Sequence, residues 1–156
     1  MSNNPTNRLL FVRHGAIRTR RSHPPPIVLP PLSERGLTDA GRSAVLALRI
    51  VMEDWLDQHG VFVGRVVHTP ARRTQQTATL MFDQPREART IPNSANALAD
   101  ALFEGPGTIA VVGYNPGFIS LLNAADWPAA DRPGAFPALA IAVRGNGRWS
   151  IEAILT

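Results

Sequence analysis

The segment Leu9–Gly15 (LLFVRHG) decides how the rest of the sequence is interpreted. Four consecutive apolar residues, Leu9-Leu10-Phe11-Val12, followed at once by Arg-His-Gly, are typical of a buried strand that ends in a polar loop. A neutral imidazole can attack phosphorus, and a glycine lets the backbone approach a ligand closely. We therefore expect a strand that carries a candidate nucleophile, His14, at its carboxyl end.

Outward from this strand, apolar strands alternate with amphipathic helices. We expect further strands at 65–68, 88–91 and 108–113, and helices ending near 58, beginning at 69, covering 95–102 and beginning at 115. Two final strands, 138–143 and 148–155, flank Gly145-Asn146-Gly147, which is a strong hairpin signal. The pattern predicts an α/β fold, namely a three-layer α/β/α sandwich whose central sheet is mostly parallel with an antiparallel edge hairpin. The length of 156 residues favours a single domain, 1–156.

Helix boundaries follow from local signals. The proline-rich segment His23–Pro31 excludes a helix and favours an extended loop. The helix after it has two possible starts, at Leu32–Gly36 or at Leu37–Gly41, because each contains a Leu-Ser/Thr-x-x-Gly pattern. Thr69 is expected to act as the N-cap of the next helix, with Pro70 in its first position.

Three loops are expected to meet at one edge of the sheet: Arg13–Ala16, His68–Arg73 and Gly113–Gly117. Each follows a predicted strand, and ligands of such folds bind at the carboxyl ends of the strands. Arg73 lies one turn into a helix, and helix N-termini favour bound anions. The three loops together therefore predict a phosphate pocket.

Charge and composition limit the classes of partner. The formal net charge is +4, and the basic residues other than histidine are all arginines. The arginines are scattered, and only Arg18, Arg20 and Arg21 lie close together in sequence, whereas a nucleic-acid binder would gather them on one face. Guanidinium groups bind phosphate in a bidentate manner. We therefore expect a phosphorylated ligand and no nucleic acid.

Cysteine and hydropathy patterns point to a cytoplasmic protein. The chain has no cysteine, which excludes disulfides and thiolate metal sites. It has no run of about 18 apolar residues and no apolar stretch at the N-terminus, so neither a membrane span nor a signal peptide is expected. The oligomeric state is left open.

Three blocks of the sequence resemble the histidine phosphatase (phosphoglycerate mutase-like) superfamily. Residues 9–15 are similar to its strand ending in Arg-His-Gly. Residues 67–78 (VHTPARRTQQTA) are similar to its Ser-Pro-x-x-Arg-x-x-Gln-Thr-Ala block, with Thr69 in the place of serine. Residues 109–117 (IAVVGYNPG) are similar to its Val-Gly-His-Asn-Pro-Gly block, with Tyr114 in the place of histidine. The short chain resembles the small bacterial phosphohistidine phosphatase branch.

The resemblance implies a role for individual residues. His14 matches the nucleophile that forms a phosphohistidine, and Arg13 and Arg73 match the two arginines that clamp the phosphoryl oxygens. Gly15, Thr69 and Asn115 are expected to help bind phosphate, as neighbours of these groups in the three loops. The family uses no metal, and the resemblance implies no cofactor here.

Tyr114 is the main departure from the family pattern, because a cationic histidine donor is replaced by a neutral hydroxyl. Losing a preorganised donor costs on the order of 10²–10³ in rate. Three explanations stay open: a slower phosphatase with Tyr114 as donor, a pseudophosphatase that binds phosphate or phosphoprotein without turnover, or a substitute histidine. His68 and His23 are the candidate substitutes, and His59 is assigned no role.

No leaving-group acid is evident in the sequence. Glu87, Asp100 and Glu104 are the carboxylates between the second and third blocks, and each is more typical of a surface charge. Phosphohistidine and other phosphoramidates need less help from an acid, because the leaving nitrogen is easily protonated. The expected substrate is therefore a phosphohistidine or a small phosphate compound, in a phosphoprotein or a phosphorylated small molecule. No mutase activity is expected, and whether the 18–31 loop acts as a lid is left open.

Overall fold

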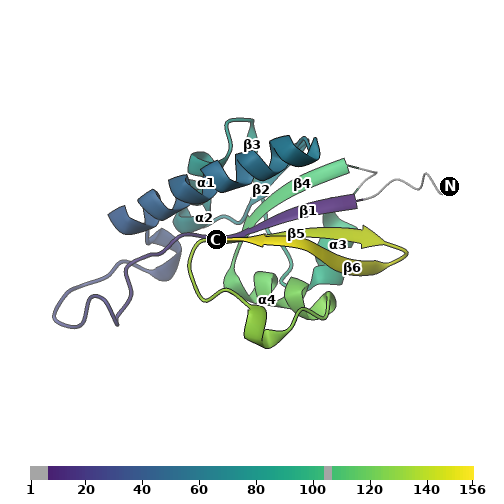
Figure 1. Ribbon diagram of the computed structural model, residues 1–156. Helices are drawn as coiled ribbons and strands as arrows, with labels where there is room; N and C mark the ends of the chain where they lie inside the picture. The colour runs from purple at the N-terminus through teal and green to yellow at the C-terminus, as the bar shows by residue number, and fades with distance from the viewer. Residues whose placement is uncertain (1–6, 104–106) are drawn as a thin grey trace.

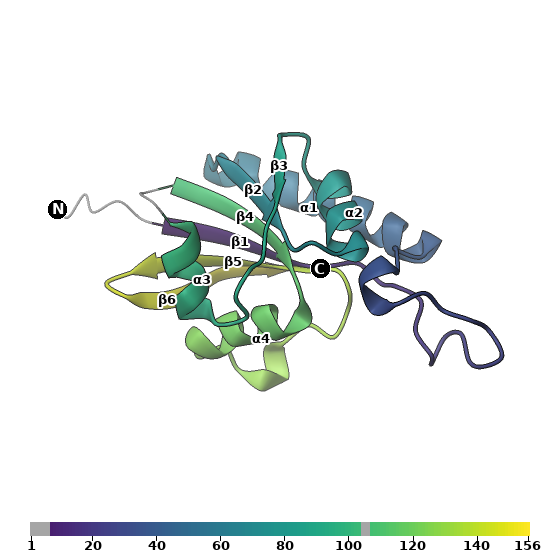
Figure 2. The same cartoon turned by 180° about the vertical axis from the view of Figure 1, so that it is seen from behind.

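A six-stranded sheet forms the centre of the computed structural model, which describes residues 7–103 and 107–156. Its strand order is β3-β2-β4-β1-β5-β6 (Figures 1 and 2). The strands are β1 (Asn7–Arg13), β2 (Arg65–His68), β3 (Arg86–Ala88), β4 (Gly107–Gly113), β5 (Ala138–Gly145) and β6 (Arg148–Leu155). Strands β1 to β4 pair in parallel, whereas β5 is antiparallel to both β1 and β6. The predicted mostly parallel sheet with an antiparallel edge hairpin is confirmed.

Helices cover both faces of this sheet, as Figure 1 shows. On one face lie α1 (Asp39–His59) and α2 (Arg72–Met81), and on the other lie α3 (Ala95–Leu102) and α4 (Asn115–Ala124). Successive side chains of a strand point to opposite faces. Accordingly, Leu10 and Val12 of β1 pack in the core under α1 and α2, while Leu9 and Phe11 pack under α3 and α4. The predicted three-layer architecture is confirmed.

Helix α1 begins at the second of its two predicted starts. Thr38 is the N-cap, and its hydroxyl accepts a hydrogen bond from the Gly41 N–H at 2.9 Å. The first candidate start, Leu32–Glu34, forms only a short 3₁₀ helix. At the other end Gly60 has a left-handed conformation (φ 61°), as a helix-terminating glycine does.

The start of α2 differs from the prediction. The helix begins at Arg72 with Ala71 as N-cap and no side-chain cap, so the prediction that Thr69 caps it is wrong. The Thr69 hydroxyl instead donates to Thr74 Oγ1 at 2.8 Å. Thr69 and Pro70 thus extend the turn after β2 and move the helix start two residues further along the chain.

Further boundaries also differ from the prediction. The N-cap of α4 is Tyr114, so Asn115 is the first helical residue rather than the cap. Strand β3 covers 86–88 instead of the predicted 88–91. The hairpin turn has positive φ at Asn146 (55°) and Gly147 (73°), which matches the type I′ geometry expected for Gly145-Asn146-Gly147.

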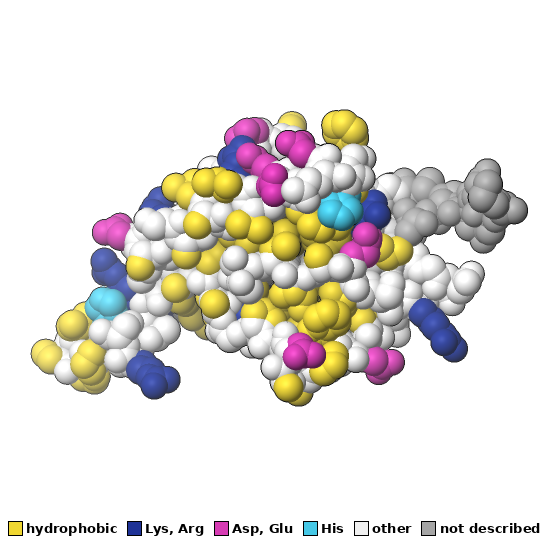
Figure 3. Space-filling model, viewed as in Figure 1, with side chains coloured by type: hydrophobic (Ala, Val, Ile, Leu, Met, Phe, Trp, Pro, Cys, Tyr) yellow, Lys and Arg dark blue, Asp and Glu magenta, His cyan; other side chains and the backbone are white. Residues whose placement is uncertain are grey.

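The loop between β1 and α1 projects from the body of the molecule in Figures 1 and 2. Its side chains include exposed apolar groups, Ile27 and Val28, and Val28 is 88% exposed. Apolar groups are visible on this projection at the left of Figure 3. In the part of the chain that the structure describes, no helix is both long and apolar enough to cross a membrane.

Candidate active site

A cavity of about 400 Å³ opens where β1 and β4 end, beside the first turn of α2. Its lining includes four of the predicted site residues, namely His14, Arg73, Tyr114 and Asn115. The other residues that line it are Ala16, Ile17, Thr19, Leu32, Pro116 and Phe136. The structure therefore brings together groups from the first, second and third blocks, as the three-loop argument predicts.

The His14 imidazole has both ring nitrogens engaged. Arg73 Nε donates to His14 Nε2 over 3.3 Å, which makes Nε2 the acceptor. The protonated Nδ1 then donates to the Gly15 carbonyl at 2.8 Å. This tautomer leaves the Nε2 lone pair as the nucleophilic site of the ring.

His14 is held neutral by its surroundings. Burial lowers the pKa of His14 to about 4, because the charged imidazolium would lose its hydration. The hydrogen bond to Gly15 opposes this shift, while the positive charges of Arg73 and Arg13 add to it. At pH 7 the imidazole is therefore neutral, as a nucleophile must be.

Arg73 is buried and is fixed by three neighbours. Its Nη1 donates to the Leu32 carbonyl at 3.1 Å, its Nε donates to His14, and its guanidinium lies 4.5 Å from the centre of the Tyr114 ring. Burial lowers the pKa of Arg73 from its ordinary value, but the group remains a cation at neutral pH. The ring face of Tyr114 thus supports the guanidinium directly.

Thr77 connects the first two blocks. Its hydroxyl accepts from the Gly15 N–H at 3.1 Å and donates to the Arg73 carbonyl at 2.7 Å. The Gly15 N–H, predicted to help bind phosphate, is therefore bonded to the protein. The glycine is required for another reason: a β-carbon there would lie 2.8 Å from Val45 Cγ2.

Arg13 is buried beside the cavity and is absent from its lining. Its guanidinium donates to Asn115 Oδ1 at 3.0 Å, to the Pro133 carbonyl at 3.0 Å and to the Ala135 carbonyl. The Phe136 ring centre lies 4.0 Å from this guanidinium. Phe136 therefore lies against Arg13, the arginine that the sequence predicts to clamp phosphate. Asn115 lines the cavity, and its side-chain oxygen accepts a hydrogen bond from Arg13.

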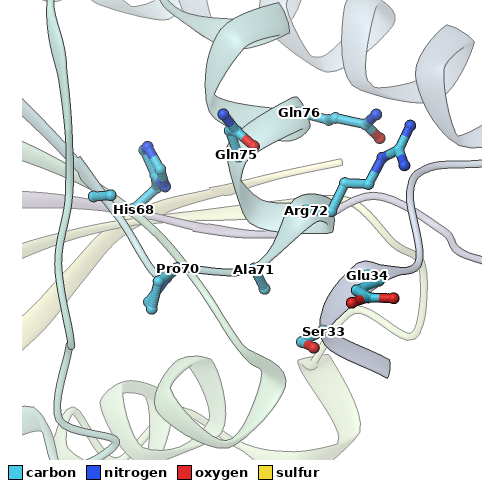
Figure 4. Close-up of a pocket in the computed structure, with 9 residues that line it drawn as sticks. Ser33, Glu34, His68, Pro70, Ala71, Arg72, Gln75 and Gln76 are labelled. Atoms are coloured by element: carbon cyan, nitrogen blue, oxygen red, sulfur yellow. The ribbon is translucent and has the colours of Figure 1, made fainter. Parts of the chain in front are cut away.

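The remaining histidines lie away from the His14 cavity. His68 is buried, and its Nδ1 is 2.9 Å from the Thr69 carbonyl oxygen. It lines a neighbouring pocket together with Glu34 and Gln75 (Figure 4). Thr69 lines neither pocket. His23 is bonded to the Ser22 hydroxyl in the projecting loop, so neither histidine is in position to replace a second catalytic histidine.

None of the described carboxylates lines the His14 cavity. Glu87 forms an ion pair with Arg65 at 2.8 Å, and Asp100 lies 3.9 Å from Arg144. Glu104 lies outside the described residues. Within those residues, no group of three or more histidine, aspartate or glutamate side chains is placed to hold a metal ion.

Sequence reasoning missed two residues of the site, Leu32 and Phe136. Leu32 supplies the carbonyl that binds Arg73, and the Phe136 ring lies 5.3 Å from the His14 ring. Both lie on connecting segments without periodicity. One signal could have indicated Phe136, which lies two residues before β5. Strand β5 begins at Ala138, and Ala138 pairs with Arg13 at the end of β1.

The fold is shared with solved histidine phosphatases and phosphoglycerate mutases, which confirms the resemblance at the level of architecture. No family sequence model and no curated protein sequence matches the chain. The protein histidine phosphatase SixA, solved with tungstate, superposes with a TM-score of 0.70 at 18% identity over 96% of each chain. SixA from Agrobacterium tumefaciens also superposes at 0.70, with 20% identity over 96% of each chain. A phosphoglycerate mutase from Bacillus anthracis superposes at 0.68, with 12% identity over 97% of this chain and 93% of that one.

Proposed function

We propose that the protein is a phosphohydrolase that acts through a phosphohistidine on His14. The observation that carries this proposal is the state of His14: a buried, neutral ring whose Nδ1 is fixed by Gly15 and whose Nε2 faces Arg73 in the cavity. The shared fold of the SixA proteins supports the same chemistry. The proposed activity needs no metal, and we place it in the cytoplasm.

The proposed reaction has two steps. His14 Nε2 attacks phosphorus, a nitrogen–phosphorus bond forms, and the bond to the leaving group breaks with its electron pair. Water then attacks the phosphohistidine, which releases inorganic phosphate and restores the neutral ring. The leaving group takes its proton from water, because the described residues place no carboxylate in the cavity.

Arg73 has to change partner during this reaction. In the free protein its Nε–H occupies the lone pair that attacks phosphorus. A phosphoryl group offers anionic oxygens, which bind a guanidinium more strongly than a neutral nitrogen does. Substrate binding would thus draw Arg73 from Nε2 to the phosphoryl oxygens and expose the nucleophile. Positioning and charge stabilisation of this kind account for most of the catalysis in phosphoryl transfer.

The substrate class follows from what the cavity provides. Without a nearby acid, a phosphohistidine or another phosphoramidate is favoured over an alkyl phosphate, since its leaving nitrogen is easily protonated. Faster release from an alkyl phosphate than from a phosphoramidate of similar size would overturn this substrate proposal.

A pseudophosphatase that binds phosphate without turnover is the second candidate. Tyr114 favours it, because its ring packs against Arg73 at the position where the family has a catalytic histidine. Under this alternative the cavity would still bind a phosphoryl group through Arg73.

Phosphate release from an aryl phosphate distinguishes the two candidates. We expect turnover by the wild type, loss of at least 10²-fold in His14→Ala because the nucleophile is removed, and no change in Arg148→Ala, a control in the exposed hairpin. Tyr114→His should raise the rate. A silent wild type with an active Tyr114→His variant would establish the pseudophosphatase instead.

A further inference from the structure

A second cavity with a high positive charge lies next to the His14 cavity. Its volume is about 240 Å³, and its lining includes Arg18, Arg35, Arg42 and Arg72 with one acidic residue, Glu34. Four positive charges and one negative charge leave a formal charge of +3. Arg18, Arg42 and Arg72 are exposed, so water screens the repulsion among the guanidinium groups, and the net positive charge of the cavity attracts anions.

The four arginines come from four separate segments of the chain. Arg18 follows β1, Arg35 follows the 3₁₀ helix at Leu32–Glu34, Arg42 is in the first turns of α1, and Arg72 is the first residue of α2. None of the ion pairs formed by the described residues involves any of the four. Among the described residues, no carboxylate therefore neutralises any of these four guanidinium groups.

Local packing shapes the cavity. Arg35 Nε donates to the Pro30 carbonyl at 2.9 Å, which orients the guanidinium. Gln76 Oε1 accepts from the Leu37 N–H at 2.8 Å. A β-carbon at Gly36 would lie 2.8 Å from that Gln76 oxygen and 3.1 Å from Arg72 Nε, so this glycine makes room for both side chains. Figure 4 shows Arg72 and Gln76 extending from α2 toward the segment that follows Glu34.

We propose that this arginine cavity is a second binding site, which takes a single phosphate group. Its volume is below the 300–1,000 Å³ typical of pockets for drug-sized ligands, and guanidinium forks match phosphate oxygens. The phosphate is either a second group of the substrate or a separate phosphate ligand. The 3₁₀ helix connects the two cavities, because its Leu32 lines the His14 cavity and its Glu34 lines the arginine cavity.

The test titrates the arginine Nε–H signals in ¹H–¹⁵N spectra with inorganic phosphate at constant ionic strength. We expect saturable shifts at Arg35 with a dissociation constant of their own. Arg42→Gln should raise this constant about tenfold, because one charge-assisted contact is lost. Glu34→Gln should lower it, because an opposing charge is removed. Arg148→Gln is the matched control and should leave it unchanged.

Two kinetic arms identify the source of the phosphate. If it belongs to the substrate, Arg42→Gln should raise KM about tenfold for an aryl bisphosphate and leave KM for the monophosphate unchanged. If it is a separate ligand, Arg42→Gln should change neither KM, while the Arg35 titration is still weakened. Shifts at Arg35 that do not saturate, or an Arg42→Gln constant within twofold of the wild type, would overturn the second site. The titration needs no turnover, so its failure is distinct from failure of the proposed phosphatase activity.

Discussion

His14 is kept neutral by burial, and this makes the folded protein sensitive to acid. Its pKa is about 4 in the folded chain, against an ordinary value of 6.5. As the pH falls from 7 to 4, the unfolded chain binds a proton at this residue that the folded chain does not. The free energy of unfolding therefore decreases over this range, by about 3 kcal/mol from His14 alone.

Urea unfolding at pH 7 and pH 4 measures this contribution. The wild type should lose about 3 kcal/mol more than His14→Gln between the two pH values, because glutamine does not titrate. The other histidines and the carboxylates are present in both proteins, so their contributions to the loss of unfolding free energy cancel in the comparison. Equal losses in the two proteins would show that His14 titrates normally in the fold.

Tyr114 offers two different groups to the site, a ring face and a hydroxyl. The structure shows the ring face against the Arg73 guanidinium, an interaction worth about 0.5–2 kcal/mol. We expect Tyr114→Phe to retain phosphate release within about threefold, whereas Tyr114→Leu should reduce it about tenfold. Equal, large losses in both variants would show that the hydroxyl is the important group.

At the level of elements, the contact between α1 and the loop after β1 depends on Gly41. A β-carbon there would lie 2.5 Å from the Ala16 carbonyl oxygen, and backbone cannot move aside as a side chain can. Gly41→Ala would gain about 1 kcal/mol in helix propensity but should lower stability by a net 1–3 kcal/mol, roughly the cost of overpacking.

Ser43→Ala, at an exposed position of the same helix, is the control for Gly41→Ala. It should be neutral or slightly stabilising, because alanine is the better helix former. Thermal unfolding of both variants provides the comparison. A Gly41→Ala protein that is more stable than the wild type would contradict the close approach of the helix and the loop.

Elements with strong local signals were predictable from sequence. The Asn146-Gly147 turn, the limits of α3 at 95–102 and the end of α1 near residue 58 all depend on neighbouring residues, and the structure has them where they were expected. The α2 start was not predictable in this way. Thr69 resembles an N-cap in sequence, but its hydroxyl donates a hydrogen bond to Thr74 instead of capping the helix. Both kinds of partner are close in sequence, so the local pattern does not distinguish them.

The site was predictable in its parts and less so in its contacts. His14, Arg73 and Tyr114 line one cavity because parallel strands end at one edge of a sheet. The position of Arg13 under Phe136 was not predictable, because it depends on carbonyls of residues 133 and 135, about 120 residues further along the chain. Every residue has a backbone carbonyl, so the sequence does not indicate which carbonyls of a loop bind a distant side chain.

At the level of the whole molecule, two apolar cores share one sheet. Strand β1 contributes Leu9 and Phe11 to one core and Leu10 and Val12 to the other, so neither core can be exposed without disturbing the same central strand. This arrangement favours a single cooperative transition.

Equilibrium unfolding in urea tests this cooperativity with two probes. Far-UV circular dichroism reports the helices on both faces, and fluorescence reports the tryptophans, including the buried Trp149 of β6. The two curves should share one midpoint and one slope. Separate midpoints would indicate that one layer of helices unfolds before the other.

The Thr77 hydroxyl bridges Gly15 and Arg73, and so it joins the backbones on which the proposed nucleophile and its guanidinium partner are carried. Together with the hydrogen bond from Arg73 Nε to His14 Nε2, this bridge links the loop after β1 to α2 at two places. These two links restrain the separation of His14 and Arg73, which should vary less than it would if either link were absent.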